Sequence, residues 1–152
     1  MKKLMFLIMG VTLLLGACGA NEGSSRLALM NKTNPDPVHT ADNGSKVSEK
    51  SVEKDVEALP ELYDVAVIKG KKDFLVAYKV KHLQRFRMKE IEKKLSDKLE
   101  KKYPNEKFTV SSDYKIFLEA TRLQERIKSG KYNDKAAEKR LQEIIELQKE
   151  KT

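Results

Sequence analysis

The residue with the most distinctive chemistry in this 152-residue chain is Cys18, its only cysteine. A single thiol cannot form a disulfide within the chain, and it cannot supply a thiolate metal site by itself. A catalytic thiol needs a base and an orienting group held around it, whereas the residues after Cys18 have the composition of a flexible tether. Two alternatives remain: a free thiol, buried or on the surface, and a thiol used for covalent attachment.

The residues before Cys18 have the layout of an export signal. Two lysines precede an apolar run, residues 4–15, which is shorter than the roughly 20 residues that a transmembrane helix needs. Residues 15–18, LGAC, are similar to the bacterial lipobox. That resemblance implies a thioether-linked diacylglyceryl group on Cys18, cleavage between Ala17 and Cys18, and anchoring in membrane lipid through fatty acids such as palmitate. We therefore expect an extracytoplasmic lipoprotein of the cell membrane.

The positive charge of the chain suggests a second kind of contact. The formal net charge is +8, and it falls to +6 when Lys2 and Lys3 leave with the signal peptide. One interpretation is a docking surface for anionic lipid headgroups or anionic envelope polymer. Its candidate residues are Lys69, Lys71, Lys72, Arg85, Arg87 and Lys89. The alternative is a solvated helix face held by i,i+4 pairs such as Glu90 with Lys94.

Other chemistries have weaker signals in the sequence. His39 and His82 lie far apart in the sequence, and no further ligands at metal-binding spacing accompany them. No G-x-S-x-G or Walker loop is present, so we expect no enzyme, no cofactor and no metal. Nucleic acid is not an expected partner, because export separates the protein from it and no aromatic stacking platform is evident.

Local patterns predict helices and strands after residue 47. Ser48 or Ser51 can cap a first helix that Pro60 ends, and two β-rich runs, "LYDVAVIKG" and "DFLVAYKVK", have the form of a hairpin. A helix is predicted from about Phe86 to Lys102, with Met88 on its apolar stripe. "KFTVSS" predicts a third strand, and Asp113 can cap the helix that follows it.

These elements predict an α+β fold in the order α-β-β-α-β-α, with a small mixed three-stranded sheet, helices packed on one face and a distal C-terminal helix. The strand, helix and strand from residue 73 to 112 form a crossover unit, which favours parallel pairing. The expected organisation is a signal peptide at 1–17, a flexible tether at 18–47, the α+β domain at 48–130 and a charged C-terminal helix at 131–152.

Two segments carry a family resemblance. They are "VAVIKGKKDFLVAYKVKH", which precedes a basic amphipathic helix, and "YPNEKFTVSSDYKIFLEATRLQERI". Together with the lipobox and the polar tether they resemble the YhcN/YlaJ family of sporulation lipoproteins over residues 18 to about 128. Residues 65–67 match the family's first strand pattern, and residues 109–113 match its later strand and helix cap. The chain departs from the family at Tyr114, where proline is usual, and in its longer final helix.

The family resemblance implies a cellular setting. It implies synthesis during endospore formation in a Gram-positive cell, residence on the spore inner membrane, and an accessory role in spore formation or germination beside other envelope proteins. A second resemblance is architectural: the helix, strand, strand, helix, strand order looks like a BON domain, with Gly70 in the place of its usual glycine. Some BON domains contact anionic phospholipid, which implies a binding module of the general cell envelope.

Overall fold

The computed structural model describes residues 32–40 and 44–151. The predicted signal peptide and the predicted lipid-attachment residue Cys18 lie outside these residues. The residues from Asn34 onward form one compact unit. In chain order its elements are β1 (Val38–His39), α3 (Glu49–Glu57), β2 (Leu62–Lys69), β3 (Asp73–Val80), the 3-10 helix η1 (His82–Arg87), α4 (Met88–Lys102), β4 (Lys107–Ser111), α5 (Tyr114–Lys128) and α6 (Asp134–Lys149).

The described strands form one mixed four-stranded sheet in the order β1-β2-β3-β4, so the mixed α+β class is confirmed. β2 and β3 pair antiparallel, and β3 and β4 pair parallel across the α4 crossover, as predicted. The prediction of three strands is wrong because β1 adds a parallel edge strand, with Val38 opposite Ile68. This strand lies inside the range that we expected to be tether. Two residues in extended conformation carry too little pattern to be recognised in a sequence.

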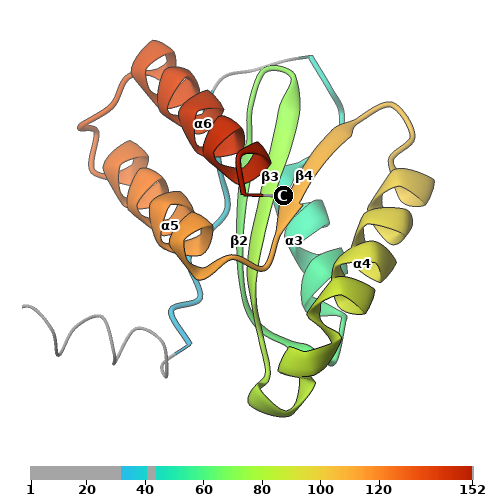
Figure 1. The fold of residues 1–152 in the computed structure, drawn as a ribbon. Coiled ribbons are helices and arrows are strands. Elements are labelled where there is room, and N and C mark those ends of the chain that lie inside the picture. The colour runs from blue at the N-terminus through green and yellow to red at the C-terminus, as the bar shows by residue number, and fades with distance from the viewer. Residues whose placement is uncertain (1–31, 41–43, 152) are drawn as a thin grey trace, which may run out of the picture. The chain divides into compact units, whose positions relative to one another are not determined.

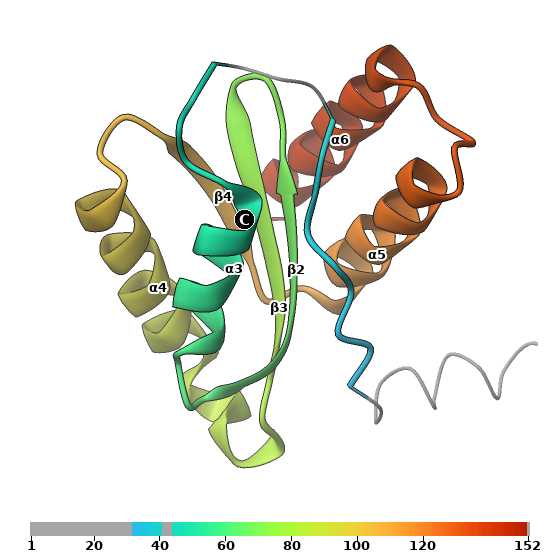
Figure 2. The same cartoon turned by 180° about the vertical axis from the view of Figure 1, so that it is seen from behind.

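Helices cover both faces of the sheet, so the prediction of one covered face is also wrong (Figures 1 and 2). α3 and α4 pack on the face that presents Val67, Val76 and Tyr78. α5 and α6 pack on the face that presents Ile68 and Leu75. Alternate residues of a strand point to opposite faces, and every residue of β3 is buried because both of its faces are covered.

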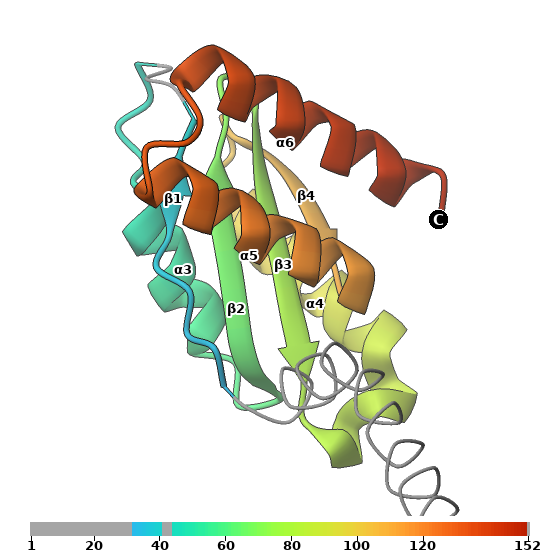
Figure 3. The same ribbon diagram turned by 90° about the vertical axis from the view of Figure 1, so that its left-hand side faces the viewer.

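The C-terminal helix is not distal. α6 lies beside α5 over the sheet (Figure 3), and its buried residues are Ala137, Leu141, Ile144 and Ile145. Gly70 shows how closely it packs, since a Cβ atom at this position would lie 2.6 Å from Leu141 Cδ2. Burying the apolar stripe of α6 completes the second core, so this helix belongs to the folded unit.

Helix ends follow the sequence signals closely. Ser48 Oγ accepts a hydrogen bond from Ser51 N, and Asp113 accepts from the backbone of the first turn of α5. Asn133 caps α6 by accepting from Ala136 N, and Gly130 adopts a φ of +69° just after α5. These caps satisfy backbone N–H groups that have no partner inside the helix.

The predicted helix over residues 86–102 starts differently. Its first part is η1, and regular α-helix begins only at Met88. The buried stripe of α4 consists of Ile91, Leu95 and Leu99. Met88, which we predicted to lie on this stripe, is 38% exposed instead. η1 has no buried residue, so the core-facing stripe begins at Ile91.

Candidate functional site

The six candidate docking residues do not form one surface. Lys71 and Lys72 are exposed in the turn between β2 and β3, whereas Arg85 and Arg87 are exposed in η1, beyond the other end of β3. β3 has eight residues, and a strand of that length spans about 25 Å. Figure 1 shows the hairpin turn and η1 at opposite ends of the sheet. The two groups of cations cannot contact the same small ligand.

Lys69 is buried and not on the surface. It is 7% exposed, and its Nζ donates hydrogen bonds to Ser45 O at 3.0 Å and to Val47 O at 2.8 Å. These bonds hold the segment before α3 against the end of β2. Lys69 therefore does not belong to a docking surface in this fold.

The end of the sheet after β3 carries an unusual surface, and we call residues 81–89 the η1 tip. Leu83 is 77% exposed and Phe86 is 84% exposed. In a 3-10 helix, residues three apart lie above one another, so these two side chains share one side of η1. Together with Met88 they are the exposed large hydrophobic residues of the described chain. Sequence reasoning missed them because it assigned Met88 to the buried stripe of the predicted helix and gave Leu83 and Phe86 no role.

Basic side chains surround these apolar groups. Lys81, Arg85 and Lys89 are exposed, and none of them forms an ion pair within residues 32–40 and 44–151. Arg87 is different, because its Nη2 lies 2.6 Å from Glu90 Oε1. The hydrogen bond from Arg87, with its charge, lowers the pKa of the Glu90 carboxyl. The η1 tip thus combines exposed apolar area with a net positive charge.

A buried ion pair lies at the same end of the sheet. Lys79 Nζ is 2.8 Å from Asp64 Oδ2, and their side chains are 5% and 0% exposed. The two residues are partners across β2 and β3. Lys79 Nζ also lies 4.7 Å from the centre of the Phe117 ring and 5.1 Å from that of Tyr63. Such a desolvated pair is held by its geometry, and removal of either member leaves a buried charge.

The first residue of the folded unit is hydrogen-bonded to this ion pair. Asn34 N donates to Asp64 Oδ1 at 3.1 Å. Further along, Gln124 Nε2 donates to Asp36 O at 3.0 Å, Lys128 forms an ion pair with Asp36, and Thr40 N donates to Lys69 O at 2.8 Å. Residues 34–40 are therefore fixed along the edge of β2. Since β1 runs parallel to β2 and Asn34 is bonded to Asp64, Asn34 lies at the end of the sheet from which η1 extends.

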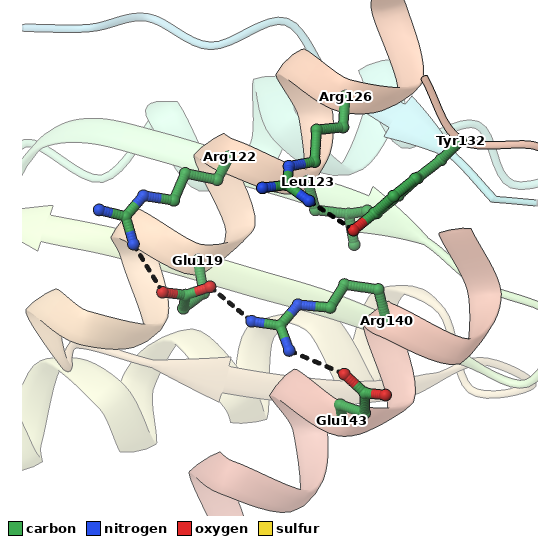
Figure 4. A pocket seen from close by; sticks show the side chains of 7 residues that line it. All are labelled: Glu119, Arg122, Leu123, Arg126, Tyr132, Arg140 and Glu143. Carbon is green, nitrogen blue, oxygen red and sulfur yellow. Dashed lines mark hydrogen bonds and ion pairs between the residues drawn. The ribbon is translucent and has the colours of Figure 1, made fainter. Parts of the chain in front are cut away.

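A second charged region is a cavity of about 380 Å³ between α5 and α6 (Figure 4). We call its ion-paired side chains the α5–α6 network. Arg140 connects the helices, with 2.6 Å from Nη2 to Glu119 Oε2 and 2.7 Å from Nη1 to Glu143 Oε2. Arg122 lies 2.8 Å from the other oxygen of Glu119. The cavity is lined by Glu119, Arg122, Leu123, Arg126, Tyr132, Arg140 and Glu143.

The charged side chains that line this cavity interact with groups beside them. Burial disfavours ionisation of Glu119, but the hydrogen bond from Arg140 and the charges of two arginines outweigh it and lower the pKa of this carboxyl. Arg126 Nη1 donates to Tyr132 Oη at 2.6 Å, and its guanidinium lies 5.3 Å from the centre of that ring. This arrangement cross-links two helices, and sequence reasoning did not predict it because the partners lie on different elements.

The two histidines remain on separate features. His39 Nδ1 lies 3.2 Å from Glu49 Oε1, and His82 begins η1. Among the residues that the structure describes, no group of three or more His, Cys, Asp or Glu side chains could hold a metal ion. No helix within the described ranges has the length and apolar character needed to cross a bilayer.

Comparisons of the chain with protein-family models, with curated proteins and with solved structures found no match.

Proposed function

We propose that this protein is a membrane-anchored lipoprotein with a non-catalytic, accessory role in spore formation or germination. In this proposal Cys18 carries the lipid, cleavage after Ala17 releases the signal peptide, and residues 18 to 33 connect the anchor to the folded unit. The protein lies on the outer face of the cell membrane. In the spore, this is the inner membrane. Its partners are membrane lipid and other proteins of the spore envelope.

The observation that carries the proposal is the sequence "LGAC" directly after a basic start and a short apolar run. This layout gives the thiol a use that a lone cysteine otherwise lacks. Two acyl chains would make the attachment durable, because each buried methylene contributes about 0.8 kcal/mol. The sporulation role is supported by the resemblance of residues 65–67 and 109–113 to the YhcN/YlaJ pattern.

The test is an immunoblot of membrane fractions from growing cells, sporulating cells and dormant spores, with the wild type compared with Cys18→Ala. We expect the protein in the spore inner-membrane fraction and its loss from that fraction in the variant. Equal abundance in growing cells would contradict the sporulation role. Retention of the Cys18→Ala protein at wild-type level in a cleaved form would contradict the lipid anchor.

A second candidate function is a BON-like module that binds anionic phospholipid or envelope polymer in the general cell envelope. The observation that favours it is the η1 tip, where Leu83 and Phe86 are exposed beside Lys81, Arg85 and Lys89. Exposed apolar side chains among cations are typical of surfaces that meet a membrane. This candidate replaces the first if the protein is equally abundant in growing cells and in spores.

A further inference from the structure

The η1 tip exposes apolar side chains that the fold gives no reason to expose. Elsewhere in the described chain large apolar residues fill the two cores, while Leu83 and Phe86 remain 77% and 84% exposed. They stand three residues apart in a 3-10 helix and so project on the same side. A pair of large apolar groups held on a short helix can enter the boundary between headgroups and acyl chains.

The charges around this pair fit an anionic lipid surface. Lys81, Arg85 and Lys89 flank Leu83 and Phe86 in sequence, and all three are exposed. Anionic headgroups attract each nearby cation, and that attraction acts over about a Debye length. Apolar area at the centre and positive charge at the rim are therefore complementary to a bilayer that contains acidic phospholipid.

The position of the tip relative to the chain's path adds an independent argument. Asn34 is bonded to Asp64, whose cross-strand partner is Lys79, and η1 begins three residues after Lys79. The folded unit thus receives the chain from Cys18 at the end of the sheet that bears the tip. The chain between Cys18 and Asn34 can extend at most about 55 Å, because each residue spans about 3.4 Å. A lipid on Cys18 and the tip can therefore reach one membrane together.

We infer that the η1 tip is a second membrane contact: Leu83 and Phe86 insert into the membrane that holds the protein's own lipid anchor, while Lys81, Arg85 and Lys89 bind its anionic headgroups. The sheet then stands with its η1 end on the membrane and its β2–β3 turn away from it. This inference rests on the proposed lipid attachment at Cys18 and adds the orientation of the folded unit.

The experiment measures which end of the lipidated full-length protein meets the bilayer. The mature protein is purified and placed in phosphatidylcholine vesicles with or without phosphatidylglycerol. Because lipid occupies the Cys18 thiol, an introduced cysteine is the only reactive one. Leu83→Cys is labelled with the environment-sensitive dye NBD, and Lys72→Cys, at the opposite end of β3, is the matched control. Lipids with nitroxide-labelled acyl chains report depth by quenching.

We expect a severalfold rise of emission and strong quenching at position 83 in vesicles with phosphatidylglycerol, and neither change at position 72. Phe86→Ser in the Leu83→Cys protein should reduce the rise at least by half. Arg85→Glu should reduce it in anionic vesicles, while Lys135→Glu on α6, an equal change of charge at an exposed site, should not.

The outcomes separate the inference from the proposed function. If mass spectrometry shows lipid on Cys18 and the protein floats with the vesicles, but position 83 stays as exposed to water as position 72, the inference is overturned and the lipoprotein proposal stands. Equal quenching at both positions also overturns it, since the unit would then have no fixed orientation. Absence of lipid on Cys18 overturns both.

Discussion

The η1 tip and the α5–α6 network are both rich in cations, but they differ in what surrounds each charge. In the network, Arg140 and Arg122 share the carboxylate of Glu119, and the paired groups connect two packed helices. At the tip, Lys81 and Arg85 lie beside the exposed Leu83 and Phe86. By composition alone the two regions look alike, since both are rich in basic residues. The partner of each charge and the exposure of nearby apolar groups distinguish a structural cross-link from a surface available for contact.

The largest effect should come from the buried pair near the tip. Lys79→Met leaves Asp64 buried without its cation, and we expect a loss of about 3–5 kcal/mol in the free energy of unfolding. Chemical denaturation followed by circular dichroism measures it. Arg85→Met is the control at an exposed site and should change stability by less than about 0.5 kcal/mol. Equal effects of the two variants would contradict the contrast between paired and surface cations.

Breaking the α5–α6 network should have a smaller effect. Arg140→Met removes ion pairs to Glu119 and Glu143, and the Arg140 side chain is 37% exposed, so solvent already weakens both pairs. We expect a loss of about 1 kcal/mol in the free energy of unfolding. Lys135→Met, an exposed change on the same helix, serves as its control. A loss as large as that of Lys79→Met would mean that the network is effectively buried.

The pH dependence of stability tests the same network. The pKa of Glu119 is lower in the fold than its ordinary value of 4.5. Its contribution is therefore complete above the ordinary value and disappears as the pH falls through the lowered one. Glu119→Gln should be less stable than the wild type at pH 7, and the difference, less than about 1 kcal/mol, should shrink toward pH 3. A constant difference over this range would contradict the ion-pair account.

The smallest effect on folding should come from the apolar residues of the tip. Leu83→Ser with Phe86→Ser removes side chains that contribute little to either core, so we expect a change within about 0.5 kcal/mol. Thermal unfolding of the unbound protein measures it. Leu95→Ala in α4 is the contrasting variant, because this side chain is fully buried and its truncation should cost about 2–5 kcal/mol. A large loss in the double variant would place the tip in the core.

Regular elements could be predicted from the sequence because their signals are local. Ser48 and Asp113 cap helices as expected, and the alternation of apolar residues identifies the two long strands. The number of covered faces could not be predicted, because it depends on the side of the sheet on which α5 and α6 pack. The edge strand β1 was missed for a similar reason, since two residues gain strand geometry only from Ile68 and Lys69 beside them.

The candidate site was predicted only in part. Arg85, Arg87 and Lys89 do lie together at one end of the sheet, as their closeness in sequence suggests. Lys69 could not be assigned from its residue type, because its burial follows from carbonyl groups of residues 45 and 47. Phe86 was placed in an α-helix, since a helical period of 3.6 fits the apolar residues that follow it. In the structure Phe86 belongs to η1, which has no buried residue.

The path of residues 34–40 also has a mechanical consequence. This segment runs along β2, and it is fixed at one end by the bond from Asn34 to Asp64 and at the other by the bond from Thr40 to Lys69. Tension on the chain before Asn34, applied along the sheet axis, would load these hydrogen bonds in shear, and they would have to break before the force reached α3. Because Val38 lies in this segment and belongs to the second core, that core would also resist the pull before α3 is reached.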